Sequence, residues 1–154
     1  MHAPTLTDGV VTLRAHRDDD LPGVFEQSQD PRSQAFTSIP VPYTHDDARE
    51  FVAEVVPRGW AEDTEWAFAL EHEGRYGGTM SLRNDGHRRA ELAFGSHPAV
   101  RGTGAVERGV RLLLEWGFGT RDLRVVTWRA NVGNWGSRRL AHRVGFSLDG
   151  TCAG

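Results

Sequence analysis

Apolar side chains recur along residues 105–118 at the spacing of an amphipathic helix. The apolar positions are Val106, Val110, Leu113, Leu114 and Gly117, and the charged positions between them are Glu107, Arg108, Arg111 and Glu115. Residues three and four apart share one face of a helix, so this pattern predicts a helix that packs on a sheet and turns its charged face to solvent.

Five runs of residues are predicted to form strands, and the first of them is β-branched and alternating. The runs are Val10–Ala15, Trp66–Leu70, Gly77–Arg83, Ala90–Ser96 and Leu123–Arg129. Turn residues at 71–74 and at Asn84-Asp85-Gly86 separate the three middle runs, which indicates an antiparallel meander. The last strand follows a helix, so we expect it to lie parallel to its predecessor.

Two further helices are expected before the meander and one after the last strand. Asp18–Asp20 and Pro22 form a helix start, and that helix should end before Asp30-Pro31. Thr44–Asp47 resembles a capping box, and an apolar face follows in the order Ala48, Phe51, Val52, Val55 until Pro57–Gly59 ends or kinks the helix. The final helix should run from Asn134 to a C-cap at Gly145.

The stretch Arg101-Gly102-Thr103-Gly104-Ala105 lies directly before the amphipathic helix. Its two glycines let the backbone turn sharply with its N–H groups exposed. Unpaired amides at a helix N-terminus attract phosphate, which makes a phosphate-bearing cofactor the leading hypothesis. The alternative is an ordinary strand-to-helix turn in which the glycines serve geometry alone.

Composition narrows the class of protein. The 154 residues are 38% hydrophobic and 25% charged, as expected for one globular α/β domain spanning residues 1–154. The net charge of −3 predicts no nucleic-acid partner, and the absence of a long apolar run or an apparent signal peptide predicts a cytoplasmic protein without a membrane partner. One cysteine, Cys152, excludes an internal disulfide and a cysteine-cluster metal site, and no metal is expected.

Two motifs that follow one another along the chain resemble those of the GCN5-related N-acetyltransferases (GNAT), in particular the branch of the ribosomal-protein-alanine acetyltransferases. Arg101–Val106 matches the family's Q/R-x-x-G-x-G/A loop, with Val106 replacing the final small residue. Asn134–Ser137 followed by Gly145-Phe146 is similar to the family's N-x-x-S…G-F helix. The resemblance implies the GNAT fold, a mostly antiparallel mixed sheet with one splayed parallel pair and flanking helices, in a cytoplasmic bacterial enzyme.

The resemblance also implies acetyl-CoA as the co-substrate and assigns residues to it. Phe94, Gly95 and Ser96 would pair with the pantetheine as if it were a strand, and Asn134 would contact the arm of the cofactor. The diphosphate would lie on the loop, whose residues are Arg101, Gly102, Thr103, Gly104, Ala105 and Val106.

The implied reaction is acetyl transfer to a primary amine, of a protein N-terminus or a small molecule, by direct attack on the thioester. Many relatives place a tyrosine on the last helix as the proton donor to the leaving thiolate, but the matching position here is Ala141. Ser137 is the replacement we predict, and the alternative for it is a first-turn serine that bonds the backbone. Glu91, on one strand face with Ala93 and Gly95, is the predicted base, ahead of the weaker candidates His97 and His142.

Two features concern the acceptor. The loop 36–43 contains Phe36, Ile39 and Tyr43, which we expect either to line the acceptor pocket or to tuck onto the core. Only eight residues follow Gly145-Phe146, where the family continues with two strands. We therefore expect either that the C-terminal strands are truncated or that a partner in a homodimer covers the edge of Leu123–Arg129. The alternative function is therefore a non-catalytic CoA-binding or dimerising domain.

Overall fold

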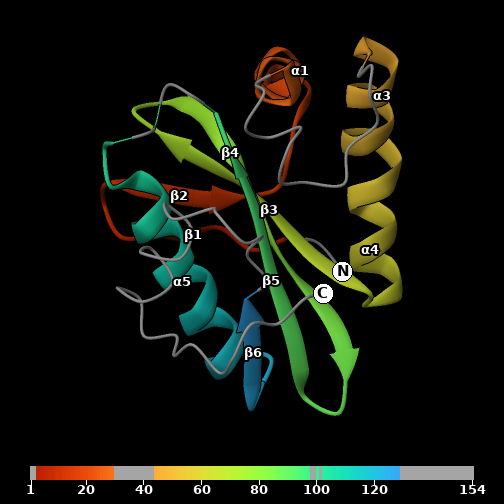
Figure 1. Ribbon diagram of the computed structural model, residues 1–154, viewed down its shortest axis with the longest axis vertical. Helices are drawn as coiled ribbons and strands as arrows, with labels where there is room; N and C mark the ends of the chain where they lie inside the picture. Colours follow the sequence, from red (N-terminus) through yellow and green to blue (C-terminus); the bar gives the residue numbers. More distant parts are fainter. Residues whose placement is uncertain (1–2, 30–43, 98–99, 101, 129–154) are drawn as a thin grey trace.

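The computed structural model describes residues 3–29, 44–97, 100 and 102–128. Its centre is a six-stranded sheet in the order β1-β2-β3-β4-β5-β6 (Figure 1). The strands are β1 (Leu6–Thr7), β2 (Val11–Arg14), β3 (Glu65–His72), β4 (Arg75–Gly86), β5 (Arg89–Ser96) and β6 (Val125–Trp128). Every neighbouring pair is antiparallel except β5 and β6, which are parallel. The predicted mixed sheet is thereby confirmed.

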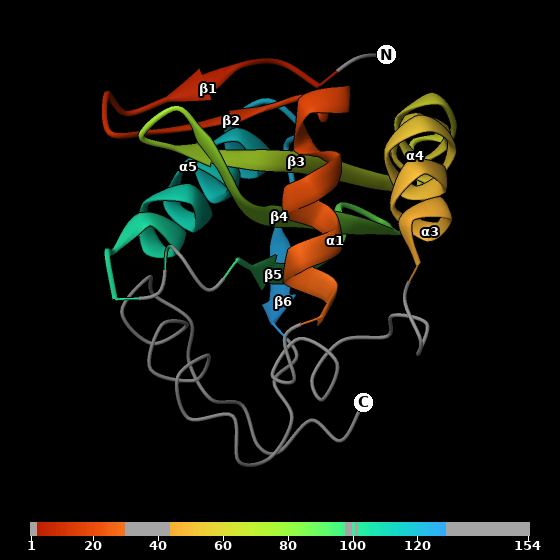
Figure 2. The ribbon, with the colours of Figure 1, turned by 90° about the horizontal axis from the view of Figure 1, so that it is seen from above.

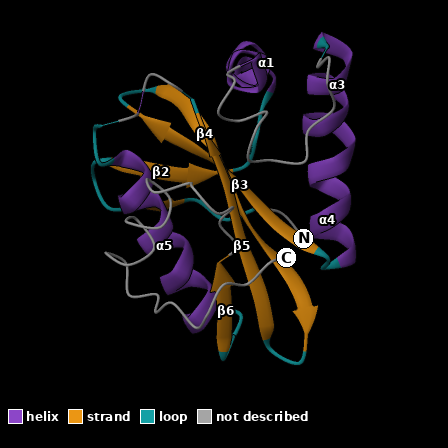
Figure 3. Ribbon diagram, viewed as in Figure 1, coloured by secondary structure: helices purple, strands orange, loops and turns teal. Residues whose placement is uncertain are grey.

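Helices cover both faces of this sheet (Figures 2 and 3). They are the 3₁₀ turn η1 (Asp18–Asp20), α1 (Leu21–Gln29), α3 (His45–Glu50), the single π-helical turn η2 (Phe51–Val55), α4 (Val56–Glu62) and α5 (Ala105–Gly119). Helix α1 lies against one face, where Gly23 approaches Tyr76 of β4, and α5 packs on the other, where Gly109 approaches Met80 and Leu70. Within the described ranges, no helix combines the length and the hydrophobicity that a bilayer span requires.

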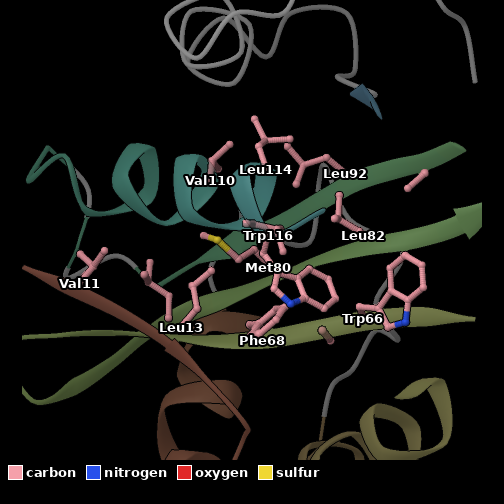
Figure 4. Close-up of a cluster of buried hydrophobic side chains, with 14 of the residues drawn as sticks. Val11, Leu13, Trp66, Phe68, Met80, Leu82, Leu92, Val110, Leu114 and Trp116 are labelled. Atoms are coloured by element: carbon pink, nitrogen blue, oxygen red, sulfur yellow. The ribbon is translucent and has the colours of Figure 1, made fainter. Parts of the chain in front are cut away.

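The core between α5 and the sheet confirms the amphipathic pattern (Figure 4). Val110 and Leu113 of α5 are fully buried against strand residues such as Phe68, Met80 and Leu92. Glycine allows the helix to come this close, because a Cβ at Gly117 would lie 2.8 Å from Leu82 Cδ1. Close packing fixes the start of α5, and therefore the glycine loop, beside the end of β5.

The helix after Thr44 differs from the sequence expectation at its C-terminal half. The capping box is confirmed, since the Asp47 amide donates to the Thr44 hydroxyl over 3.1 Å and the Thr44 amide donates to the Asp47 carboxylate over 2.9 Å. Of the two outcomes predicted at Pro57–Gly59, an end or a kink, the end does not occur, because the helix continues to Glu62. The π turn before Pro57 adds a residue to the turn, so Val56 is buried and Val55, predicted on the core face, is 42% exposed.

Helix α4 also covers an open edge of the sheet. Strand β2 pairs with β3 only from Ala69 to His72, which leaves the first half of β3 without a neighbour on that side among the described residues. The Trp60 indole N–H of α4 donates to the carbonyl of Ala67 over 2.9 Å and so provides a partner for one backbone group of this edge. Gly59 lies so close that a Cβ there would be 2.7 Å from the carbonyl oxygen of Glu65.

The second turn of the meander lies further along the chain than predicted. Strand β4 runs through Asn84-Asp85-Gly86, and the turn is His87–Arg88, whose φ angles are 54° and 62°. The Gly86 amide donates to the Asn84 side chain over 2.9 Å, and the β4–β5 register is irregular at this point. The residues Asn84-Asp85-Gly86, which were predicted to form a turn, therefore form a bulge within the strand.

Candidate active site

The glycine loop turns at its two glycines, as predicted. Gly102 and Gly104 have φ angles of 79° and 81°, values that favour glycine, and Gly104 is the N-cap of α5. The Thr103 hydroxyl donates to the carbonyl of Val100 over 2.5 Å and accepts from the amide of Ala105 over 3.2 Å. Thr103 thus holds the loop in shape, a role that the motif alone did not reveal.

Amides of the loop remain available for a ligand. Among the described residues, no acceptor is found for the amides of Gly102, Gly104 and Val106, whereas those of Thr103 and Ala105 donate within the loop. A Cβ built at Gly102 or Gly104 meets nothing within 4 Å, so the space beside both residues is open. Open space and unpaired amides at a helix N-terminus suit a phosphate oxygen, so these residues fit the diphosphate of acetyl-CoA.

Strand β5 leads into this loop with one edge on β4 and the other on β6. Its pairing with β6 runs from Arg89 to Leu92, so Phe94, Gly95 and Ser96 lie beyond the last described residue of β6. The Phe94 side chain packs against the α5 core. The predicted pantetheine-binding segment is therefore at the end of β5 that adjoins the glycine loop.

The predicted base lies on the face of the sheet that α1 covers. Register pairs Glu91 with Arg83, Ala93 with Ser81 and Gly95 with Thr79, and these residues share the face opposite α5. Glu91 is partly buried and Ala93 is exposed. Among the described residues, no group of three or more His, Cys, Asp or Glu side chains could hold a metal ion.

A chain of hydrogen bonds crosses this same face. The Tyr76 hydroxyl donates to Gln27 Oε1 over 2.7 Å, and its oxygen lies 2.7 Å from Thr79 Oγ1, which lies 2.8 Å from His16 Nε2. Burial lowers the pKa of His16 to about 4, so the ring is neutral at neutral pH. The members come from α1, β4 and the segment after β2, and no sequence spacing indicated that they would meet.

The start of α1 is anchored by buried charges that the sequence did not indicate either. Arg14 donates to both carboxylate oxygens of Asp20 over 2.8 Å and to Glu71 over 2.9 Å. Burial by itself would raise the pKa of Asp20, but hydrogen bonds from Arg14 and from the Arg17 amide hold that pKa below its ordinary value. The ionised pair fixes β2, η1 and α1 relative to one another.

Two hollows flank the hydrogen-bond chain. A polar groove of about 750 Å³ lies between α1, the β3–β4 turn and the start of the glycine loop, and Glu26, Tyr76, His97 and Val100 are among its lining residues. His97 is a weaker candidate for the base, and its Nε2 lies 3.5 Å from Oε1 of Glu26. A cavity of about 30 Å³ lies under η2, lined by Thr79, Ser81, Glu65 and apolar side chains.

Several predicted site residues lie outside the described residues. They are Phe36, Ile39, Tyr43, Arg101, Asn134 and Ser137, together with Ala141 and His142. The described part of the site therefore comprises the loop from Gly102 to Val106, the end of β5 and the face that carries Glu91.

Comparisons with known proteins agree with this geometry. The family model described as an acetyltransferase (GNAT) domain matches residues 11–147. A search of curated protein sequences returns no match.

Solved structures share the fold at low sequence identity. RimL, a ribosomal L7/L12 alpha-N-protein acetyltransferase in complex with coenzyme A, superposes with a TM-score of 0.85 at 16% identity, over 96% of this chain and 86% of that chain. Mycobacterium smegmatis RimJ in complex with CoA-disulfide superposes with a TM-score of 0.83 at 19% identity, over 97% of this chain and 80% of that chain. The microcin C7 self-immunity acetyltransferase MccE, in complex with acetyl-CoA and AMP, superposes with a TM-score of 0.77 at 17% identity, over 93% of this chain and 82% of that chain.

Proposed function

The chain belongs to the GNAT family of acetyl-CoA-dependent N-acetyltransferases, and we propose that it acetylates a primary amine, either the N-terminus of a protein or a small amine. The observation that carries the proposal is the glycine loop at the start of α5, whose open amides adjoin the end of β5. RimL supports a protein acceptor, since it is an alpha-N-protein acetyltransferase by name, and MccE, which was solved with acetyl-CoA and AMP, supports a small one.

The reaction joins the amine nitrogen to the acetyl carbon and breaks the carbon–sulfur bond of the thioester. The attacking amine must be neutral, and it loses a proton as the amide forms. The leaving thiolate of CoA takes up one proton, so the products are the N-acetylated amine and free CoA thiol. A base near the amine and a donor near the sulfur are therefore the two groups that the chain should supply.

The roles that we propose follow the predictions from the sequence. Glu91 takes the proton of the amine, directly or through water, from its position on the α1 face. Ser137 donates to the leaving sulfur. The pantetheine pairs with Phe94, Gly95 and Ser96, the diphosphate lies on Arg101–Val106, and Asn134 contacts the arm of the cofactor. Phe36, Ile39 and Tyr43 line the acceptor pocket.

Binding and turnover test these roles separately. Titration with acetyl-CoA in a calorimeter should show binding, with several charge-assisted amide contacts of about 1.5–3 kcal/mol each supporting a micromolar Kd. Glu91→Gln and Ser137→Ala should each lower kcat about 100-fold, the lower part of the range for general acid–base catalysis, while acetyl-CoA affinity stays unchanged.

Glu62→Gln is the matched control for Glu91, because Glu62 is an exposed carboxylate at the end of α4. It should leave both kcat and affinity unchanged. Absence of binding at about millimolar acetyl-CoA would contradict the proposed function. Normal turnover in Glu91→Gln and Ser137→Ala would remove the two catalytic assignments and leave the family assignment standing.

A further inference from the structure

Arg108 lies in the first turn of α5, four residues after Gly104, the N-cap of the helix. The Arg108 amide donates to the carbonyl of Gly104 over 3.2 Å, and residues four apart lie on one side of a helix. Helical side chains lean towards the N-terminus of their helix, so the guanidinium of Arg108 can extend back over the turn that begins at Gly104. The space beside Gly104 is open, and it is where we place the diphosphate. Arg108 therefore brings a positive charge to the phosphate site.

A carboxylate from near the start of the chain engages this guanidinium. Arg108 Nη1 donates to Asp8 Oδ2 over 3.0 Å, and Asp8 belongs to the turn between β1 and β2. The amides of Val11 and Val10 donate to Asp8 Oδ1 over 2.9 Å each, so the turn itself fixes the carboxylate. These backbone hydrogen bonds lower the pKa of Asp8 to about 2, and the group is ionised at neutral pH. A fixed negative charge thus lies beside the first turn of α5.

The ion pair between Asp8 and Arg108 is open to solvent. The Arg108 side chain is 49% exposed, and that of Asp8 is 26% exposed. Exposed pairs contribute little to the stability of a fold, because water screens them. Among the described residues, Asp8 is the only side-chain partner found for Arg108. The pair can therefore open at small cost, and a phosphate group near Gly104 would compete with Asp8 for the guanidinium.

We propose that Arg108 leaves Asp8 and binds a phosphate group of acetyl-CoA, so that the turn between β1 and β2 regulates the affinity for the co-substrate. The two partners of the ion pair then act in opposite directions. Arg108 attracts the phosphate, whereas Asp8 repels it and competes for the guanidinium. The diphosphate and the 3′-phosphate of CoA present the same chemistry to an arginine. The inference rests on the proposed function, which places the diphosphate on the glycine loop.

Two substitutions within the same ion pair test this role by calorimetric titration with acetyl-CoA. Arg108→Gln should raise the Kd about tenfold, because a charge-assisted hydrogen bond to phosphate is lost. Asp8→Asn should lower the Kd about threefold, because the competing charge is removed while the side-chain oxygen still accepts the amides of the turn. Both variants break the same ion pair, so a merely structural role would shift the Kd in the same direction in both or in neither. Either of those results overturns the inference.

Arg88 and Asp122 form the matched control pair. Their side chains are exposed and 3.2 Å apart, and Arg88 precedes β5, at the opposite end of that strand from the glycine loop. Arg88→Gln and Asp122→Asn should each leave the Kd for acetyl-CoA within about twofold of the wild-type value, because solvent and salt screen charges at that distance.

Acetyl-dephospho-CoA, which lacks the 3′-phosphate, identifies the phosphate group that Arg108 binds. The effect of Arg108→Gln should persist with this ligand if Arg108 binds the diphosphate and should disappear if it binds the 3′-phosphate, and either result supports the inference. Equal Kd values for acetyl-CoA in wild type and Arg108→Gln overturn the inference and leave the proposed function standing. If the wild-type protein binds no acetyl-CoA, the proposed function fails and the inference with it.

Discussion

Replacement of Gly104 by alanine separates the shape of the glycine loop from its role in binding. Gly104 has a φ of 81°, where a non-glycine residue is strained by about 1–2 kcal/mol. The lower entropy of the unfolded alanine chain offsets about 0.4–1 kcal/mol of that strain. A Cβ meets nothing within 4 Å, so no clash adds to the cost. We therefore expect Gly104→Ala to lower the free energy of unfolding by only about 1 kcal/mol.

The same methyl group should affect ligand affinity much more. It projects into the open space beside the loop amides, where we place the diphosphate. Displacing one charge-assisted amide contact of about 1.5–3 kcal/mol should raise the Kd for acetyl-CoA between about 10-fold and 100-fold.

Gly86 provides the matched control. Its φ is 80°, and a Cβ there also meets nothing within 4 Å, but it lies at the far end of β4 from the loop. Gly86→Ala should show the same loss in urea unfolding as Gly104→Ala and an unchanged Kd by calorimetry. Equal Kd values for Gly104→Ala and wild type, or an equal rise in the Gly86 variant, would refute the assignment of the diphosphate to this loop.

Two further predictions concern stability, measured by urea unfolding. Asp20→Asn should cost about 2–3 kcal/mol near pH 7, because it leaves the buried Arg14 guanidinium without its full partner, while the exposed Asp19→Asn should change little. The pKa of Asp20 is lowered in the folded state, so the stabilisation by its carboxylate is present above the unfolded pKa of 3.8 and is lost as the pH falls below that value. The difference in unfolding free energy between wild type and Asp20→Asn should therefore shrink in acid, and a difference that stays constant would contradict this. Gly59→Ala should destabilise the protein by about 1–2 kcal/mol, since its Cβ would lie 2.7 Å from a backbone oxygen. Gly119→Ala is the control, because the space beside Gly119 is open, and it should not destabilise the protein. A larger loss of stability in Gly119→Ala than in Gly59→Ala would contradict the packing.

Local patterns predicted most of the described fold. The 3.6-residue period of α5, the capping box at Thr44 and the runs predicted as the strands β3, β4 and β5 each depend on neighbours within a few residues, and the structure confirms all of them. The exceptions arise where a local signal has two structural outcomes. Asn84-Asp85-Gly86 supports a turn or a bulge, and Pro57 either ends a helix or follows a π turn.

The site was predictable only in part, for a related reason. The glycine loop is contiguous in sequence, so its motif reveals it. Gln27, Tyr76, Thr79 and His16 have no common spacing, because α1 and β4 bring them together only after folding. The anchor of Arg14 on Glu71 likewise joins residues 57 positions apart.

Product analysis of the wild-type reaction tests the central claim most directly. The protein is incubated with acetyl-CoA and a short peptide with a free amino terminus, and released CoA thiol and acetylated peptide are both quantified. We predict that thiol is released only when both substrates are present, with one N-acetylated amine formed for each thiol. Binding of acetyl-CoA without thiol release for any amine, or thiol release without an acetylated product, would contradict the account.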